Sequence, residues 1–441
     1  MRPHLPLTLH LAALLCLAAP AYSQPAACGS PDESLSGAYR QADGTLLAIL
    51  PGGGKDQWRI TDFNTGRSAT LRPSAPLKFE SAADLSAEQP VAYRYAFQSG
   101  AQGLAIEPVN GRAAAATRIV LRERPAAFVS GNTSLSGRLT LPAAGTGPFK
   151  AVIFVHGSDP TPSVGQEWLP HLLAANGIAT LVFDKRGTGC SQGQYMQHFG
   201  VLSDDVVAAA KWLRAQPEIR QDAVGLAGFS QGGWVAPLAA LKDPSIAFVA
   251  VGFGLAMSMA DEDWLEAPLK LRESGVDAAS VAEFEALNAA LHRVAREGFK
   301  DWSEFDALLA RFKDRAWFAA ASRQQSWLGV VMQMGLERAK ADVPGLFQHF
   351  FQPFYDPVPT LEQLKAPMLW LMAGQDIEAP PEPTLQVLAR LRAQGKPVTV
   401  RVFPNADHGL QDFVVRDGKR VRTQYADGYF PALLKWVQEQ P

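Results

Sequence analysis

The sequence has few cysteines and no excess of charge of either sign. Its three cysteines form no C-x-x-C pair, which excludes a disulfide-stapled mini-scaffold and a cysteine zinc site. Lys and Arg total 41 against 43 for Asp and Glu, and no run of like charges occurs, so the basic footprint of a nucleic-acid-binding protein is missing. We therefore expect no nucleic acid among the partners, and any metal would need histidine and carboxylate ligands.

The composition is that of an ordinary folded protein. Hydrophobic residues make up 47% of the chain and charged residues 19%, which is typical of globular proteins and not of disordered or fibrous ones. A length of 441 residues exceeds one compact core and predicts two or three domains. No internal repeat of fixed period is visible, so repeat architectures are set aside.

The first residues have the features of an export signal. Arg2 is the one charge before an apolar run at residues 11–19, which is too short to span a bilayer. Ala21 and Ser23 have the spacing of an A-x-A cleavage site. These features predict a signal peptide over residues 1–23 and a periplasmic or secreted protein without a stable membrane anchor; an N-terminal anchor is the alternative.

Export would place the remaining cysteines in an oxidising compartment. Cleavage after residue 23 removes Cys16 and leaves Cys28 and Cys190, between which a disulfide is then allowed. Their separation along the chain does not decide whether they pair, so two free thiols are the alternative.

The pattern along the mature chain changes twice. Residues 24–126 alternate short apolar runs with Gly, Asn and Pro, which predicts a small all-β domain of antiparallel strands. Residues 127–254 and 366–441 alternate runs rich in Val, Ile and Leu with helical stretches, which predicts an α/β core with a mostly parallel sheet and helices on both faces. Residues 255–365 show only helical periodicity and many aromatic residues, which predicts a helical cap inserted into the core.

The sharpest motif is G-F-S-Q-G at residues 228–232, between a predicted strand at residues 223–227 and a helix. A tight strand-to-helix turn of this kind, a nucleophile elbow, lifts a serine hydroxyl above the edge of the sheet. The glycines are needed because the strained turn leaves no room for a Cβ. The motif therefore makes Ser230 the candidate nucleophile.

A serine nucleophile needs a base, and the base needs an orienting acid. Asp376 follows the predicted strand at residues 367–372, and His408 follows the one at residues 398–403. The carboxyl ends of parallel strands meet at one edge, so we expect both side chains near Ser230. His408 would be the base and Asp376 the acid. Two other acids, Glu378 and Asp412, are the alternatives to Asp376 and lie nearby in the sequence.

Acyl transfer also needs N–H donors for the developing oxyanion. One is expected from Gln231, the residue after the nucleophile. The other is expected from the loop after the predicted strand at residues 151–155, where the N–H of Ser158 is favoured and Gly157 or Asp159 are alternatives. His156, at the start of that loop, is expected to stabilise it and not to act as a base.

These motifs resemble those of the α/β-hydrolase superfamily, in particular secreted bacterial serine hydrolases of the serine aminopeptidase-like and dienelactone hydrolase-like branches. The resemblance also rests on H-G-S at residues 156–158 and on D-K-R-G-T-G-C-S at residues 184–191, where Arg186 is expected in a salt bridge. It covers the chain from residue 128 except the cap. It implies hydrolysis of carboxylic esters, and of thioesters or peptides in some branches. The triad mechanism needs no cofactor.

The leading hypothesis is an exported carboxylesterase that acts through an acyl-enzyme on a small ester with an apolar acyl or aryl group. The pocket for that group would come from aromatic residues of the cap and from four methionines. These are Met257, Met259, Met332 and Met334. The eight histidines are scattered and no H-E-x-x-H occurs, so we expect no metal.

Two alternatives remain open at this level. A peptidase or acyl-aminoacyl hydrolase would use the same triad, and Asp261, Glu262 and Asp263 could then bind a substrate amine. A non-catalytic protein could instead bind glycan or cell-wall ligands on a hydrolase scaffold. An intact set of triad candidates argues against this second alternative.

Overall fold

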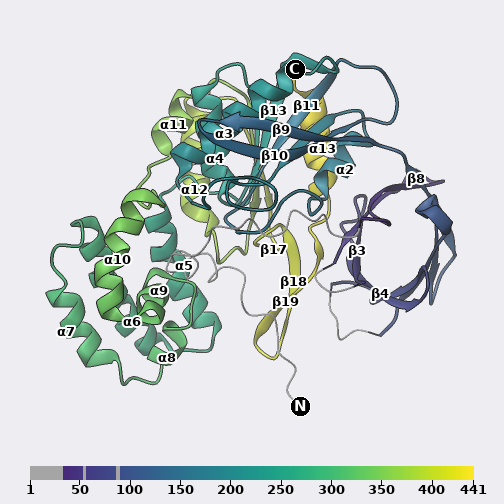
Figure 1. Ribbon diagram of the computed structural model, residues 1–441. Helices are drawn as coiled ribbons and strands as arrows, with labels where there is room; N and C mark the ends of the chain where they lie inside the picture. The colour runs from purple at the N-terminus through teal and green to yellow at the C-terminus, as the bar shows by residue number, and fades with distance from the viewer. Residues whose placement is uncertain (1–32, 53–55, 86–89) are drawn as a thin grey trace.

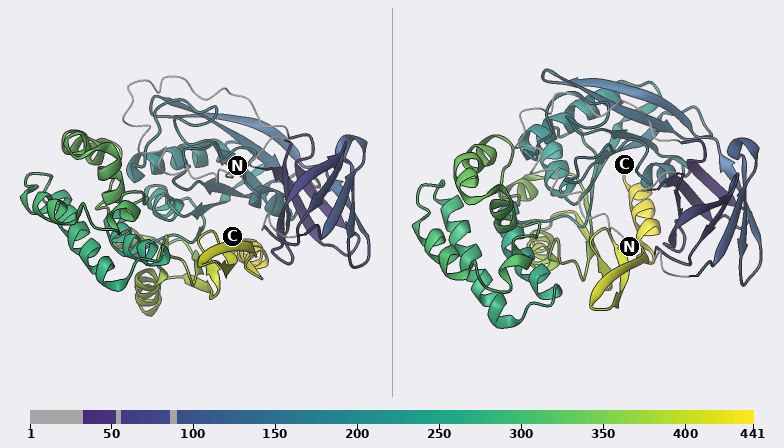
Figure 2. Two further views of the ribbon diagram at one scale, coloured as in Figure 1. Left: turned by 90° about the horizontal axis from the view of Figure 1, so that it is seen from below. Right: turned by 60° about the horizontal axis from the view of Figure 1, so that its bottom comes forward.

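The computed structural model describes residues 33–52, 56–85 and 90–441. These residues form a β-barrel, an α/β core and a helical insertion (Figure 1). In both views of Figure 2 the barrel and the helical insertion lie at opposite ends of the core. The predicted signal peptide at residues 1–23 and the cysteines Cys16 and Cys28 lie outside the described residues.

The N-terminal part is a closed antiparallel barrel of eight strands. Its strands are β1 (Gly37–Gln41), β2 (Leu46–Pro51), β3 (Trp58–Asp62), β4 (Ser68–Ala75), β5 (Lys78–Ser81), β6 (Tyr93–Phe97), β7 (Gly103–Pro108) and β8 (Ala114–Ile119). The first strand pairs with the last, which closes the sheet and leaves no open edge. Apolar side chains such as Tyr39, Ile60 and Leu71 form a core of their own. The predicted all-β domain is therefore confirmed.

The core is an eight-stranded sheet in the order β16-β15-β14-β13-β11-β12-β10-β9. Its strands are β9 (Arg122–Ser130), β10 (Thr133–Leu141), β11 (Phe149–Val155), β12 (Ala179–Phe183), β13 (Ile219–Phe229), β14 (Val249–Gly252), β15 (Met368–Ala373) and β16 (Val398–Phe403). Strands β11 to β16 run parallel, and β10 and β9 are antiparallel at one edge. Every residue of β12, β14 and β15 is buried, which explains their continuous apolar runs.

The sheet begins earlier than the sequence pattern indicated. β9 starts at Arg122, whereas the boundary between the β domain and the core was expected after residue 126. β9 and β10 form an antiparallel hairpin whose burial alternates between faces. Barrel strands such as β5 and β6 have the same alternation, so the local pattern cannot tell to which sheet such a hairpin belongs.

Helices cover both faces of the core sheet, as predicted. One face carries α3 (Phe199–Arg214), α4 (Gly232–Lys242), α11 (Val358–Gln363) and α12 (Pro381–Ala393). The other carries α2 (Leu169–Ala174) and α13 (Tyr429–Glu439). Barrel residues Ala38, Leu46 and Phe63 belong to the apolar cluster of this second face, so the barrel packs against the core beside α2 and α13 (Figure 1).

The helical insertion follows β14 and has its own core. Its helices are α5 (Met259–Glu273), α6 (Ala278–Arg296), α7 (Ser303–Phe312), α8 (Phe318–Ala321), α9 (Trp327–Met334) and α10 (Leu336–His349). Phe284, Phe305 and Trp317 are buried among them. α11 lies within the range predicted for the cap, yet its buried Leu361 packs with the core sheet. The inserted helices therefore end at α10.

A three-stranded sheet between β16 and α13 was not predicted. It consists of β17 (Ala406–Asp407), β18 (Gln411–Arg416) and β19 (Lys419–Tyr425). Asp417 and Gly418 have positive φ, as an Asp-Gly hairpin turn requires. This dipeptide between valine-rich runs was the signal that sequence reasoning missed. The hairpin also contacts the barrel, since Tyr425 N donates to Gly66 O at 2.8 Å.

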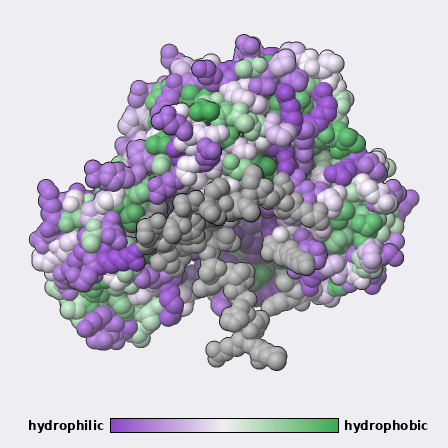
Figure 3. Space-filling model, in the orientation of Figure 1, coloured by the Kyte–Doolittle hydropathy of each residue, from purple (hydrophilic) through white to green (hydrophobic). Residues whose placement is uncertain are grey.

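The visible surface is mixed in character. In Figure 3 hydrophilic side chains are spread over the insertion, the core and the barrel, with smaller hydrophobic areas between them. Within the part of the chain that the structure describes, no helix combines the length and the apolar character needed to cross a membrane.

The tight packing around β13 predicts a stability difference between two glycine substitutions. A Cβ at Gly225 would lie 2.1 Å from the buried ring of Phe248, so Gly225→Ala should destabilise the protein by about 1–3 kcal/mol. Gly345 lies inside α10 with nothing within 4 Å of its Cβ position, so Gly345→Ala should be neutral or stabilise by up to ~1 kcal/mol. Calorimetric unfolding of both variants checks this, and equal effects would contradict the packing described for β13.

Candidate active site

Ser230 stands on a strained turn at the carboxyl end of β13. Its φ is 51°, in the left-handed region that non-glycine residues rarely adopt. A Cβ at Gly228 would lie 2.2 Å from Gly232 O, and one at Gly232 would lie 2.5 Å from Val155 O. Only glycine fits at either position, which is the physical reason for the motif around the serine.

The structure brings Ser230, His408 and Asp376 together from three loops. His408 Nε2 lies 3.2 Å from Ser230 Oγ, and His408 Nδ1 lies 2.8 Å from Asp376 Oδ2. The other carboxylate oxygen of Asp376 accepts the N–H groups of Glu378 at 2.9 Å and Ala379 at 2.8 Å. Asp376 is buried, so its carboxylate is held in one orientation toward the imidazole.

The other acids that could have oriented His408 lie elsewhere or pair with arginines. Glu378 forms an ion pair with Arg422 at 3.2 Å, and Asp412 lies on β18. Asp407 precedes His408 directly, but its carboxylate pairs with Arg420 at 3.0 Å. Within the described residues, Asp376 is the acid that hydrogen-bonds His408.

The imidazole of His408 is held in an environment that favours its charged form. Burial of the ring opposes the charge, but the charge and hydrogen bond of Asp376, together with the charge of Glu378, outweigh it. Together they raise the pKa of His408 from 6.5 to about 9. The Asp376 carboxylate can therefore stabilise an imidazolium at this position.

The loop after β11 approaches Ser230 closely. The Cβ position of Gly157 is 3.7 Å from Ser230 Cβ, and Ser158 and Gln231 line the same cavity as Ser230. In the part of the chain that the structure describes, the backbone N–H groups of Ser158 and Gln231 donate to no protein acceptor. Two free donors thus lie beside the serine.

His156, which the sequence analysis set aside as a base, is buried at the start of that loop. Its ring lies edge-on to Phe183, with ring centroids 5.3 Å apart. Burial and the nearby charge of Lys185 lower the pKa of His156 well below its ordinary value. The ring is therefore neutral and makes an apolar contact.

A cavity of about 210 Å³ lies above Ser230 and His408, between the core and the helical insertion. Most of its wall is apolar. The aromatic side chains in it are Trp234, Phe299, Trp327, Phe347 and Phe351. Of the four methionines predicted for this pocket, only Met259 is in the wall, because Met257 packs in the core and Met332 and Met334 pack among the inserted helices.

One side of the cavity is acidic. Glu262, Glu266 and Lys270 lie four residues apart along α5, so they share one face of the helix, and all three line the cavity. Lys270 pairs with Glu266, whereas Glu262 has no ion pair or hydrogen bond from its side chain to any other described residue. Burial and the charge of Glu266 raise the pKa of Glu262 well above its ordinary value.

Of the three acids predicted to bind an amine, only Glu262 faces the cavity without a partner. Asp261 is half exposed and pairs with Arg296 at 3.0 Å. Asp263 lines the cavity, but it binds His292 Nε2 at 2.8 Å and accepts the N–H of Trp327 at 2.8 Å. Glu266 was missed by sequence reasoning, although its four-residue spacing from Glu262 was a visible signal.

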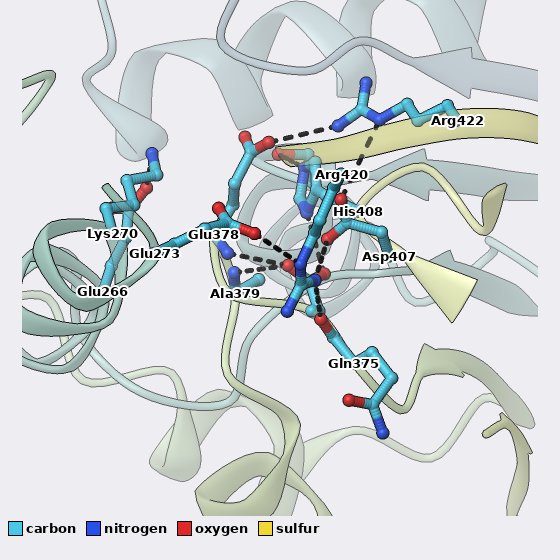
Figure 4. A network of polar contacts seen from close by, with 12 residues as sticks. Glu266, Lys270, Glu273, Gln375, Glu378, Ala379, Asp407, His408, Arg420 and Arg422 are labelled. Carbon is cyan, nitrogen blue, oxygen red and sulfur yellow. Dashed lines mark hydrogen bonds and ion pairs between the residues drawn. The ribbon is translucent and has the colours of Figure 1, made fainter. Parts of the chain in front are cut away.

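The hairpin β18–β19 holds the loops that carry His408 and Asp376 (Figure 4). Arg420 of β19 donates to Gln375 O beside Asp376 and pairs with Asp407 beside His408 at 3.0 Å. Its Nε pairs with Glu273 at the end of α5 at 2.6 Å. One arginine therefore joins both loops to the first inserted helix.

The loop after β12 has two further features. Arg186 forms the expected salt bridge, with its Nε 2.8 Å from Asp205 Oδ2. Cys190 is disulfide-bonded. The other cysteines lie outside the described residues, so pairing with Cys28 stays a prediction. No group of three or more His, Cys, Asp or Glu that could hold a metal occurs among the described residues.

The topology and the site define an α/β-hydrolase: a mostly parallel sheet, a serine on a nucleophile elbow after β13, an acid after β15 and a histidine after β16. The superfamily inferred from the sequence is therefore confirmed. Within it, the chain belongs to the X-Pro dipeptidyl-peptidase (S15) family, whose model matches residues 109–409. The protein is a hydrolase.

The similarity to individual proteins is low in sequence identity or covers only part of the chain. The chain is similar to the thiohydrolase aneE of Aspergillus aculeatus, with 34% identity over 117 residues, which is 26% of this chain and 36% of that relative's length. It is also similar to a solved esterase of Pyrococcus furiosus, with 16% identity over 66% of this chain and 84% of the esterase, at a TM-score of 0.43. A dienelactone hydrolase of Anabaena variabilis shares 16% identity over 72% of this chain and 96% of its own, at a TM-score of 0.39.

The raised pKa of His408 predicts how hydrolysis depends on pH. Only the neutral imidazole can accept a proton, so kcat/KM should rise with pH, with a midpoint near 9 instead of 6.5. Glu378→Gln removes a charge that raises this pKa and should move the midpoint to lower pH. Rates measured from pH 5 to 10 check both statements. An unchanged midpoint in the variant would contradict the electrostatic role of Glu378.

Proposed function

We propose that the protein is a serine hydrolase that cleaves carboxylic esters through a covalent acyl-enzyme. The observation that carries the proposal is the alignment of Ser230 Oγ, the His408 ring and Asp376, with contacts of 3.2 and 2.8 Å. Ser230 Oγ attacks the ester carbonyl carbon while His408 Nε2 takes its proton, and His408 then returns the proton to the leaving alkoxide. Water, activated by the same histidine, releases the acyl group.

The carbonyl oxygen of the substrate becomes negatively charged in the transition state, and N–H donors that already point toward it stabilise this charge. The free N–H groups of Ser158 and Gln231 are the candidates, since both residues border the cavity at Ser230. Asp376 holds the imidazole in the tautomer that presents Nε2 to the serine. It also stabilises the imidazolium formed in the transition state.

The cavity supports a preference for substrates of limited size with an apolar acyl or aryl group. Its volume of about 210 Å³ and its aromatic wall favour such groups. The predicted signal peptide at residues 1–23 supports action in the periplasm or outside the cell. The partner is then a small ester met in that compartment.

Labelling with a serine-directed fluorophosphonate tests the nucleophile. Wild-type protein should be labelled and should hydrolyse p-nitrophenyl butyrate, while Ser230→Ala should lose labelling and at least 10³-fold in kcat, because the variant lacks the hydroxyl that forms the acyl-enzyme. Loss of both with an unchanged melting temperature assigns the role to Ser230. A wild-type protein that does not label would support the non-catalytic scaffold instead.

A second candidate function is favoured by the unpaired carboxylate of Glu262. The chain belongs to the X-Pro dipeptidyl-peptidase (S15) family, and such a peptidase hydrolyses an amide bond. Amide hydrolysis can use the same serine, histidine and acid as ester hydrolysis. Glu262 faces the cavity without an ion-pair partner, because Lys270 pairs with Glu266, and burial and the charge of Glu266 favour its uncharged form. The positive charge of a substrate ammonium group would favour the carboxylate form of Glu262 and pair with it, which makes an aminoacyl or peptide substrate the alternative to a neutral ester.

Glu262→Gln distinguishes the two candidates. If an ammonium group binds Glu262, the variant should raise KM for an aminoacyl p-nitroanilide by about 10-fold or more, as expected for loss of a charged hydrogen bond, and leave KM for p-nitrophenyl butyrate unchanged. Asp261→Asn is the matched control, since Asp261 is the neighbouring carboxylate and pairs with Arg296 away from the cavity. Equal KM values in wild type and Glu262→Gln would exclude amine recognition at this residue.

A further inference from the structure

Lys185, the second residue of the loop after β12, is buried beneath the loop that follows β11. The residue is 1% exposed, although lysine is rarely buried completely. Its Nζ donates to Gly157 O at 2.5 Å, and it lies 3.4 Å from both Asp159 O and Gln231 Oε1. It thus contacts the loop that carries Ser158 and also the side chain of Gln231.

The contact with Gly157 determines the direction of a neighbouring donor. In a planar trans peptide the C=O and the N–H point to opposite sides. The carbonyl of Gly157 and the N–H of Ser158 belong to one peptide unit. Because the carbonyl points to Lys185, the N–H of Ser158 points away from it. Lys185 does not line the cavity above Ser230, whereas Ser158 does.

Tyr195 holds the next peptide unit of the same loop. Its hydroxyl donates to Ser158 O and accepts from Gln197 Nε2 at 2.9 Å. Its ring lies over the Lys185 ammonium, 5.0 Å from Nζ to the ring centroid. Two consecutive carbonyls, those of Gly157 and Ser158, are therefore bound by two side chains that also contact each other.

The residue before Lys185 holds the far end of the loop. Asp184 accepts the N–H groups of Ser163 at 2.9 Å and Val164 at 3.0 Å. A Cβ at Gly189 would lie 2.1 Å from the Asp184 carboxylate, which accounts for the glycine there. Asp184 and Lys185 together anchor the loop after β11 at both ends.

The donor capacity of Lys185 does not depend on its charge. Burial lowers the pKa of Lys185 to about 7, while the charge of Asp159 acts in the opposite direction. Both the ammonium and the neutral amine keep N–H groups that can bind the carbonyl of Gly157.

We propose that Lys185, assisted by Tyr195, is a positioning residue of the oxyanion hole: it orients the Gly157–Ser158 peptide so that the N–H of Ser158 faces the substrate oxygen at Ser230. The inference rests on the proposed acyl transfer at Ser230. An oxyanion donor acts mainly in the transition state, so its misplacement lowers kcat and leaves KM nearly unchanged.

Transition-state and ground-state analogues separate this role from a structural one. In Lys185→Met, kcat should fall about 10- to 100-fold, a part of the loss seen when an oxyanion donor is removed outright. Inhibition by an aryl trifluoromethyl ketone, which forms a tetrahedral oxyanion on serine, should weaken by a similar factor. Binding of the corresponding secondary alcohol, which forms no oxyanion, should change less than about 3-fold, because ground-state contacts are kept.

Tyr195→Phe provides a second variant that removes one hydroxyl and keeps the ring. In this variant kcat and the affinity for the ketone should fall about 10-fold or less, and binding of the alcohol should stay nearly unchanged. The loss is smaller than in Lys185→Met because the contact between Lys185 and Gly157 remains. This variant keeps the proposal falsifiable if Lys185→Met does not fold.

Lys150→Met is the matched control. Lys150 Nζ also donates to backbone carbonyls, those of Val437 and Gln438 at 2.9 Å each, at the end of α13. Its replacement should lower the melting temperature without a selective loss of affinity for the ketone.

Equal weakening of ketone and alcohol binding in Lys185→Met or in Tyr195→Phe would overturn the positioning role, and so would an unchanged kcat. The proposed function would survive that outcome if wild-type protein still reacts with a fluorophosphonate at Ser230. If wild-type protein neither labels nor hydrolyses esters or amides, the proposed function fails and the positioning role fails with it.

Discussion

Ser230 adopts a φ of 51°, and the strained turn around it is the constraint on which the rest of the site depends. Gly228 and Gly232 make the turn possible, because a Cβ at either position would collide with a carbonyl oxygen. The turn places the hydroxyl at the carboxyl edge of the sheet. The other polar groups reach that edge on loops that follow β11, β15 and β16. The site is therefore assembled from the ends of four strands, and its accuracy depends on how each loop is held.

Two basic side chains hold three of these loops. Lys185 binds the loop after β11, and Arg420 joins the loop that carries Asp376 to Asp407 beside His408. Each side chain donates to several oxygen acceptors at once, which offsets part of the cost of removing its N–H groups from water. In the proposed function, substrate recognition belongs to a different part of the molecule. The inserted helices supply most of the aromatic wall of the cavity and also Glu262, so substrate preference can change without altering the turn at Ser230.

The parts of the fold that could be predicted are those with a strong local pattern. Continuous apolar runs marked β12 and β15, and the glycines around Ser230 marked the strand-to-helix turn, because both patterns report local packing. The start of β9 at Arg122 could not be derived, since an alternating hairpin has the same pattern in the barrel and in the core sheet. Three of the four methionines assigned to the cavity pack elsewhere, because helical periodicity shows that a side chain is buried but not against which neighbour.

The sequence by itself determined the chemistry available: a serine on an elbow, and a histidine and an acid after later strands. Chain order and strand direction are sufficient for that, because parallel strands deliver their carboxyl ends to a common edge. Only the tertiary structure decided which acid meets His408, which carboxylate on α5 lacks a partner, and that Lys185 lies beneath the loop of Ser158. The first and the last of these facts depend on contacts between residues 28 or more positions apart, namely His408 with Asp376 and Lys185 with Gly157. The geometry of such contacts is set by the packing of whole helices, strands and loops against one another, so it cannot be derived from the local sequence pattern.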